Sequence, residues 1–220
     1  LGAGKTKDIT QKPQQWRVTI GVDAVLSSSV PLGRGLSSSA ALELAVALAV
    51  GASGPPIELA LACQVAEQRA SGVPCGVMDQ LTSAGGVEGH ALLIDFRTLT
   101  VEPVAMPSDV AVVVVHSGQG RALATSGYAE RRAQLEAAEA IVGSLRDATI
   151  EELDAIDDTR VRARARHVVS ENARVLRFAD ALRGADASAA GALMVDARAS
   201  FRDDFAASAP IVDALVERLV

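Results

Sequence analysis

The residues best suited to chemistry lie in a glycine-hinged loop that runs into a helix, Pro31-Leu32-Gly33-Arg34-Gly35-Leu36-Ser37-Ser38-Ser39-Ala40-Ala41. Glycine adopts backbone conformations with positive φ, so Gly33 and Gly35 let the backbone approach a ligand closely. The first amides of a helix lack partners inside it, and the helix dipole adds partial positive charge there. Such a loop can bind a polyphosphate without a lysine, and a serine hydroxyl can ligate Mg²⁺. By spacing alone, a capped helix after a turn explains the same residues.

Two carboxylates form the second candidate. Glu67 lies late in an apolar helix, and Asp79 lies in the first turn of the next helix, after the tight loop Gly72-Val73-Pro74-Cys75-Gly76. Taken singly, each has a structural explanation: Asp79 complements a helix dipole, and Glu67 ends a helix in solvent.

A third motif, Gly4-Lys5-Thr6, looks like the end of a Walker A loop. The polar segment Lys7-Asp8-Ile9-Thr10-Gln11-Lys12-Pro13 follows it, and this segment cannot form the apolar helix that a P-loop requires. We therefore set the P-loop interpretation aside.

The composition limits the class of protein. The chain has 220 residues, with 21 Lys and Arg against 27 Asp and Glu, a formal net charge of −6, and 49% apolar residues. The apolar fraction is that of a folded chain, and the acidic balance argues against nucleic acid or an anionic membrane as the partner. The longest apolar run, Ala40 to Ala52, contains Glu43 and is shorter than the roughly 20 residues of a membrane span.

Few residues indicate a metal centre, a disulfide or a targeting segment. Two cysteines cannot build a disulfide framework, and free thiols favour a reducing compartment. The three histidines lie far apart in the sequence, which leaves no readable zinc site. Residues 1–15 carry no apolar signal-peptide core. We expect a cytoplasmic protein.

The pattern of the chain predicts an α+β protein with a boundary near Pro107. The first helix starts among Ser37, Ser38 and Ser39, with serine as its cap. A second helix is opened by Pro55-Pro56 and ended by Gly72, and later helices are expected over 77–83, 128–142, 161–182, 186–197 and 210–219. Strands are expected over 91–96 and 111–115, the second as a continuous valine run at a sheet centre.

Taken together, the two candidate segments resemble the GHMP small-molecule kinases, and within them the galactokinase branch. Pro31–Ala41 is similar to the phosphate loop of that family, and Gly-Val-Pro-Cys-Gly-Val-Met-Asp-Gln at 72–80 is similar to the galactokinase segment around the catalytic aspartate. Weaker similarities follow at 128–132, 167–172, 193–194 and 201–205.

The resemblance implies a role for each matched residue. The catalytic residue would be Asp79, facing the anomeric hydroxyl of a sugar. The metal ligands would be Ser39 and Glu67, and the sugar would contact the Gly76 backbone and the Tyr128 hydroxyl. The ATP phosphates would be bound by the loop residues Gly33, Arg34, Gly35, Leu36, Ser37, Ser38 and Ser39.

The same resemblance implies an ATP- and Mg²⁺-dependent kinase that converts a sugar, galactose first, into its 1-phosphate. Arabinose and N-acetylgalactosamine are alternative substrates, and a non-catalytic relative that senses sugar and ATP is the alternative class. The partners implied are the sugar and ATP, with no nucleic acid and no membrane, and the chain would be a monomer or a weak homodimer. The implied fold has two lobes, one like ribosomal protein S5 domain 2 over 1–107 and a ferredoxin-like lobe with extra helices over 108–220.

Some expected family features are not found in the sequence. Residues 1–15 contain no galactose-binding signature. The glycine-rich loop that the family carries near its C-terminus is not found in the sequence up to Val220. We therefore expect a fold that is incomplete at both ends, and a polypeptide of these residues alone to be inactive. Ala197-Arg198 and His116-Ser117 also differ from the pairs usual in galactokinases, which bears on the identity of the sugar.

Overall fold

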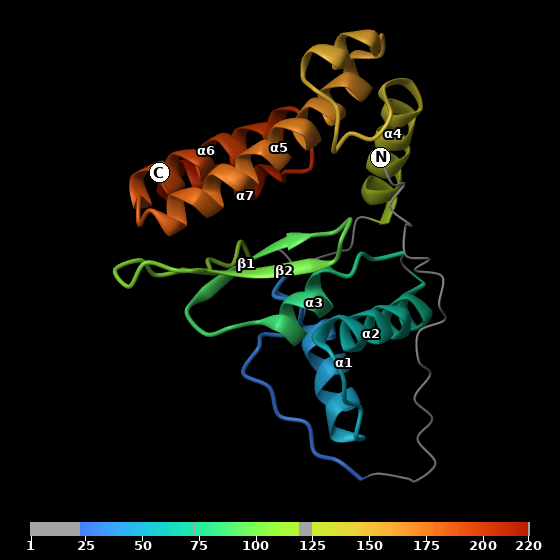
Figure 1. The fold of residues 1–220 in the computed structure, drawn as a ribbon, viewed down its shortest axis with the longest axis vertical. Coiled ribbons are helices and arrows are strands. Elements are labelled where there is room, and N and C mark those ends of the chain that lie inside the picture. Colours follow the sequence, from blue (N-terminus) through green and yellow to red (C-terminus); the bar gives the residue numbers. More distant parts are fainter. Residues whose placement is uncertain (1–22, 73, 119–124, 220) are drawn as a thin grey trace, which may run out of the picture. The chain divides into compact units, whose positions relative to one another are not determined.

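The computed structural model describes residues 23–72, 74–118 and 125–219, which form helices before and after one two-stranded sheet (Figure 1). The described residues fall into two compact units. The first comprises those up to Glu88 together with Ile94–Val101, and the second comprises Gly89–Leu93 together with those from Glu102 onward. The elements in chain order are α1 (Ser38–Ala49), α2 (Pro56–Ser71), α3 (Met78–Gly85), β1 (His90–Asp95), β2 (Thr100–Ala105), α4 (Thr125–Val142), the 3₁₀ helix η1 (Glu151–Ala155), α5 (Thr159–Arg183), α6 (Ala187–Asp203) and α7 (Pro210–Leu219).

Every α-helix predicted from the sequence is confirmed, and α6 runs six residues beyond its predicted end at Ala197. The 3₁₀ helix η1 is an addition that the sequence did not predict. No helix in the described ranges combines the length and the apolarity that crossing a bilayer requires.

Local signals explain where these helices begin and end. Pro56 occupies the first position of α2, where its missing N–H costs nothing, and Gly72 ends the helix at φ 70° in the left-handed region that glycine tolerates. In the second unit, the Asp158 side chain accepts hydrogen bonds from the backbone amides of Arg160 and Val161 at the start of α5. These two amides hold the pKa of the exposed Asp158 carboxyl below its usual value.

The predicted strands are right in one case and wrong in the other. Strand β1 confirms the expectation for 91–96, whereas residues 111–117 form no strand, and Val112 and Val113 are 79% and 78% exposed. A valine run forms a strand only beside a partner that offers hydrogen bonds. The sheet formed by the described residues pairs β1 with β2 alone. The sequence did not predict β2, because Pro103 lies in its middle and proline is confined to sheet edges.

The first unit is built on a small apolar core. Ala60 of α2, Val77 before α3 and Leu81 of α3 are buried together, and residues of the hairpin such as Ile94 and Val101 pack against them. Helices α1, α2 and α3 all contact one another. The core therefore fixes α2 and α3 against each other, and α1 is held by its contacts with both.

The second unit has two apolar clusters. One joins Val104 of β2 to α5 and α6 through Ala179, Leu182 and Leu193. The other joins α4, η1 and α5, with Ile156 and Ala165 completely buried.

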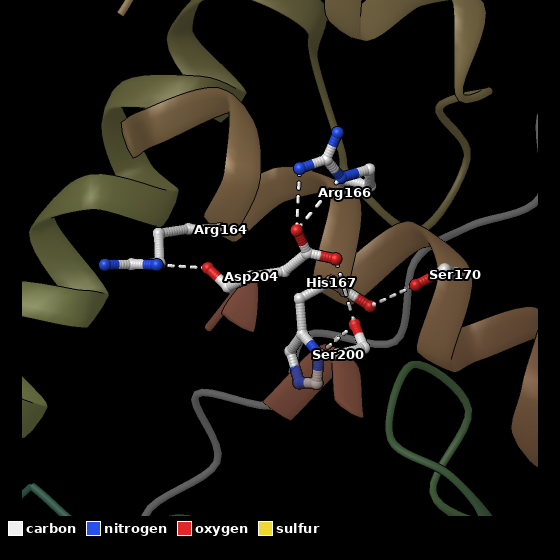
Figure 2. A network of polar contacts seen from close by, with 6 residues as sticks. All are labelled: Arg164, Arg166, His167, Ser170, Ser200 and Asp204. Carbon is white, nitrogen blue, oxygen red and sulfur yellow. Dashed lines mark hydrogen bonds and ion pairs between the residues drawn. The ribbon is translucent and has the colours of Figure 1, made fainter. Parts of the chain in front are cut away.

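A polar network also connects α5 to the end of α6 (Figure 2). The Ser200 hydroxyl lies 2.9 Å from Nδ1 of His167 and donates to Oδ2 of Asp204 at 3.3 Å. Arg166 donates to Oδ1 of Asp204 at 2.6 Å. Because the Ser200 hydroxyl donates its one proton to Asp204, it must accept a hydrogen bond from His167. The neutral imidazole ring therefore carries its proton on Nδ1. The ring also stacks on Phe205, with 4.7 Å between the centroids. Two of the weakly matching segments, 167–172 and 201–205, thus meet in one packed cluster.

Burial lowers the pKa of His167, and the neighbouring charges of Glu171, Arg174, Asp204 and Arg164 act on it in both directions. With a folded-state pKa below the unfolded value of about 6.5, the unfolded chain binds the proton first. The stability that this ring contributes is complete above about pH 6.5 and is lost as the pH falls, by at most about 1.4 kcal/mol per pH unit. We expect the melting temperature of the protein to decrease as the pH is lowered from 7.5 to 5.5. In the His167→Gln variant this decrease should be smaller.

The control is His90→Gln, because His90 is exposed at the start of β1. This variant should keep the wild-type pH dependence, as measured by thermal denaturation followed by circular dichroism. An unchanged slope in His167→Gln would show that other groups cause the acid sensitivity.

Candidate active site

The glycine-hinged loop has the backbone geometry that its sequence predicts. Gly33 and Gly35 have φ angles of 68° and 80°, and Ser37, the residue before α1, has φ 53°. The helix starts among the three serines, as expected, but the side chain of Ser37 makes no capping hydrogen bond, so the expected serine side-chain cap is wrong. Its left-handed backbone instead places Ser38 as the first helical residue. The Ser37 side chain therefore accepts no hydrogen bond from the backbone amides in the first turn of α1. These amides are suited to donate to an anionic ligand instead.

The predicted phosphate-binding residues are contiguous at this helix start. Gly33, Arg34, Gly35 and Leu36 are exposed, Ser37 and Ser38 are half-buried, and Ser39 is exposed again. A ligand can therefore reach the backbone of the loop.

The Glu67 carboxylate is the shared acceptor of the site. Its Oε1 accepts a hydrogen bond from the Ser39 hydroxyl at 2.7 Å. Its Oε2 accepts from the thiol of Cys75 at 3.6 Å and from the amide nitrogen of Gln80. The three donors come from α1, from the loop after Gly72 and from α3. The structure thus joins Ser39 and Glu67, two residues 28 positions apart in the sequence, in direct contact.

The loop between α2 and α3 is held by side chains of α2 through one of its backbone carbonyls. Gln64 and Gln68, one turn apart on α2, both donate to the carbonyl oxygen of Cys75, at 3.0 and 2.8 Å. Gly76, the predicted sugar contact, follows directly and is exposed. Burial raises the pKa of the Cys75 thiol, and the charge of Glu67 raises it further. The thiol therefore keeps its proton and remains a donor to Glu67.

Asp79 lies half-buried in the first turn of α3, between the exposed Met78 and the buried Gln80. The backbone of this turn is closed by the amide of Leu81, which donates to the carbonyl of Val77 at 2.9 Å. Because Gln80 reaches Glu67, the turn that carries Asp79 is tied to the Ser39–Glu67 pair through the adjacent residue.

Two residues of this site were not assigned roles from the sequence. Gln80 is only 1% exposed, and its amide nitrogen donates to Oε2 of Glu43 at 3.3 Å as well as to Glu67. Burial raises the pKa of the Glu43 carboxyl, the Gln80 amide opposes that rise, and the charge of Glu67 adds to it. The available signal was Glu43 itself, since it is the only charged residue in the otherwise apolar run from Ala40 to Ala52.

Other predicted residues cannot be placed in the site. Tyr128 belongs to α4 of the second unit, and its side chain lies outside the described residues. The Walker-like Gly4-Lys5-Thr6 also lies outside them.

The donor chemistry fits Mg²⁺. A hydroxyl and a carboxylate oxygen are hard ligands, and two oxygens bound to one Mg²⁺ at right angles lie about 3 Å apart. The Ser39 and Glu67 oxygens, 2.7 Å apart, are close to that spacing before any ion binds. Within the described chain, no group of three His, Cys, Asp or Glu side chains forms a metal site. Mg²⁺ usually keeps several waters and takes further ligands from substrate phosphates, so two protein oxygens are compatible with a Mg²⁺ site here.

Comparisons with known proteins identify a family model and a solved structure that this chain resembles. Residues 6–86 match the family model described as the GHMP kinases N terminal domain. The crystal structure of Lactococcus lactis galactokinase in complex with galactose superposes with a TM-score of 0.78, at 32% sequence identity over 86% of this chain. The chain spans 53% of the length of that galactokinase. The match confirms the predicted α+β architecture as part of this kinase fold.

The positive φ angle at Gly35 can be tested separately from packing, because a Cβ atom there would meet nothing within 4 Å. We expect Gly35→Ala to lower the free energy of unfolding by about 1 to 2 kcal/mol, the cost of a left-handed conformation in an L-residue. Urea denaturation measures the change.

Gly76→Ala is the matched control. Gly76 also has open space around its Cβ position, and its φ lies outside the left-handed range. Its substitution should leave stability unchanged or slightly raised, because alanine restricts the unfolded chain. Equal losses in both variants would argue against a strained loop at Gly35.

Proposed function

Because the chain belongs to the GHMP kinase family, we propose that the protein is an ATP-dependent sugar kinase that phosphorylates an anomeric hydroxyl, with galactose as the preferred substrate. The observation that carries this proposal is the contact between Ser39 and Glu67 at the start of α1, beside a loop whose backbone is open to an anion. A hydroxyl–carboxylate pair beside free helix amides is the arrangement that a metal–polyphosphate ligand requires.

The loop would bind and orient the phosphates through its backbone. The amides of residues 33–39 supply donors, and the dipole of α1 supplies partial positive charge at the same end. Phosphoryl transfer depends mainly on positioning and on charge stabilisation, so this arrangement needs no covalent intermediate.

Ser39 and Glu67 would hold the Mg²⁺ ion, which when bound neutralises charge on the phosphates. The contribution of the neighbouring side chains is to orient the Glu67 carboxylate. The Cys75 thiol and the Gln80 amide both donate to Oε2 of Glu67, which leaves Oε1 beside the Ser39 hydroxyl.

Asp79 would face the attacking hydroxyl of the sugar. As the sugar oxygen forms its bond to the γ-phosphorus and the bond to the bridging oxygen of ADP breaks, the hydroxyl proton passes to the Asp79 carboxylate. In a loose transition state this proton can move late, so a carboxylate is an adequate base. The exposed backbone of Gly76 supports a sugar contact near Asp79 in the chain, and Tyr128 is proposed as a second contact from the family resemblance.

Replacing the proposed base gives the sharpest test. In the full-length protein, Asp79→Asn should lower kcat by about 10²-fold or more, while the affinities for ATP and sugar change little. Glu58→Gln is the matched control, because Glu58 is also a carboxylate in the first turn of a helix, and it should retain wild-type kcat. Loss of sugar affinity with unchanged kcat would assign Asp79 to binding.

The substrate class is tested by sugar-dependent ADP release from the full-length protein. We expect turnover with galactose, and weaker turnover with arabinose and N-acetylgalactosamine. Isothermal titration with ATP and each sugar completes the experiment. Binding of both ligands without ADP release would overturn the kinase and favour a sensor.

The metal ligands can be tested by their Mg²⁺ requirement. Ser39→Ala and Glu67→Gln should each raise the Mg²⁺ concentration needed for half-maximal rate by about 10-fold, since each removes one oxygen ligand of the ion. Ser83→Ala, an exposed serine of α3, serves as the control. An unchanged Mg²⁺ requirement in both ligand variants would place the ion elsewhere.

A further inference from the structure

The buried amide of Gln80 joins three helices at the candidate metal site. Gln80 lies on α3, and its Nε2 donates to Glu43 on α1 at 3.3 Å and to Glu67 on α2. The side chain is 1% exposed, and the residue before it in the sequence is Asp79. Few side chains are better placed to couple these elements.

The orientation of this amide follows from its chemistry. A carboxamide nitrogen carries two N–H donors, and both are used by the two carboxylates. The opposite orientation would place Oε1 against two acceptor oxygens, which repel it. In the present orientation Oε1 is buried with no hydrogen-bond partner among the described residues. Leaving a buried acceptor unpaired is unfavourable, so the two carboxylates must outweigh this cost.

Without the amide, the carboxylates of Glu43 and Glu67 would repel each other. The Oε2 of Glu67 would then keep the longer hydrogen bond from the Cys75 thiol, at 3.6 Å, but lose its link to α3, and the contact between its Oε1 and the Ser39 hydroxyl would be held less firmly. The conformation of the metal-binding carboxylate thus depends on Gln80, and the position of Gln80 depends in turn on its anchor, Glu43.

We propose that Gln80, anchored on Glu43, is a positioning residue that holds Glu67 in its metal-binding orientation and links it to the helical turn that carries Asp79. This inference rests on the proposed function, because it takes Glu67 as a metal ligand. It predicts that removing the amide weakens metal binding even though Gln80 touches neither the metal nor the substrate.

The test measures metal affinity directly. Mn²⁺ replaces Mg²⁺, and electron paramagnetic resonance follows its binding to the full-length protein saturated with a non-hydrolysable ATP analogue. Loss of a hydrogen-bond partner behind a metal ligand typically lowers metal affinity by about 10- to 100-fold. Gln80→Met, which keeps the length of the side chain and removes the amide, should weaken Mn²⁺ binding by at least about 10-fold. Affinity for the analogue without metal should stay within about twofold of wild type.

The matched control is Gln64→Met. Gln64 is a half-buried glutamine whose acceptor, the Cys75 carbonyl, has a second donor in Gln68. This variant should bind Mn²⁺ like the wild type. A loss as large as that of Gln80→Met would mean that the loss reflects general loosening of α2, and would overturn the assignment.

A second pair of variants keeps the inference testable if Gln80→Met does not fold. Glu43→Gln retains an acceptor oxygen for the Gln80 amide and should keep Mn²⁺ affinity within about twofold of wild type, whereas Glu43→Leu removes the acceptor and should weaken it by at least about 10-fold. Thermal denaturation of every variant accompanies the titrations. Equal affinities in Glu43→Gln and Glu43→Leu would refute the anchoring role.

The outcomes separate this inference from the proposed function. If the wild-type protein binds Mn²⁺ with the nucleotide analogue and Gln80→Met binds it equally well, the positioning role is wrong and the kinase proposal stands. If the wild-type protein binds no Mn²⁺ with the analogue, both are wrong.

Discussion

The first unit is organised around one carboxylate that serves three donors. Glu67 accepts from the hydroxyl of Ser39, the thiol of Cys75 and the amide of Gln80, and these donors come from α1, the loop before α3 and α3 itself. A buried or half-buried carboxylate is costly unless it is hydrogen-bonded, so each of the three segments must take a defined position. The small core of Ala60, Val77 and Leu81 holds α2 and the start of α3 from the apolar side. Packing and hydrogen bonding therefore specify one arrangement of the site.

The second unit uses a polar network for a different purpose. Around His167, the side chains of Ser200, Asp204 and Arg166 satisfy one another, and the aromatic ring of Phe205 covers the imidazole. The hydrogen-bonding groups of this network join α5 to the end of α6. Its residues belong in part to 167–172 and 201–205, two of the segments that weakly match the kinase family. Similarity in those segments is accounted for by packing, and the residues of the first unit carry the proposed chemistry.

The sequence was most informative where several local signals agreed. Pro56 and Gly72 delimit α2 by their restricted and permissive backbones, and the position of Glu67 late in that helix follows from those limits. The valine run at 111–115 shows the opposite case, because a strand depends on a partner that the run itself does not encode. Strand β2 was not predicted, because Pro103 in its middle is unfavourable in a strand and the pairing with β1 is not visible in the sequence.

The candidate site divides in the same way. The phosphate loop and the pair of carboxylates were assigned because together they resemble two segments of the GHMP kinases, since each of them alone also has a structural explanation as a helix cap or a helix-end residue. The hydrogen bond from Gln80 to Glu43 could not be predicted, because the two residues lie 37 positions apart and nothing in the sequence indicates that they are in contact. Only the crossing of α1, α2 and α3 brings them together.

That bridge has a consequence that depends on its lack of charge. A lysine or an arginine in place of Gln80 could hold the two glutamates equally firmly, but it would cancel one of their negative charges. The amide fastens both side chains and leaves the local field as negative as they make it, apart from the burial that favours protonation of Glu43. At the proposed metal site, a divalent ion would therefore be attracted by Glu43 as well as by its ligand Glu67, and the neutrality of the Gln80 side chain would preserve that attraction.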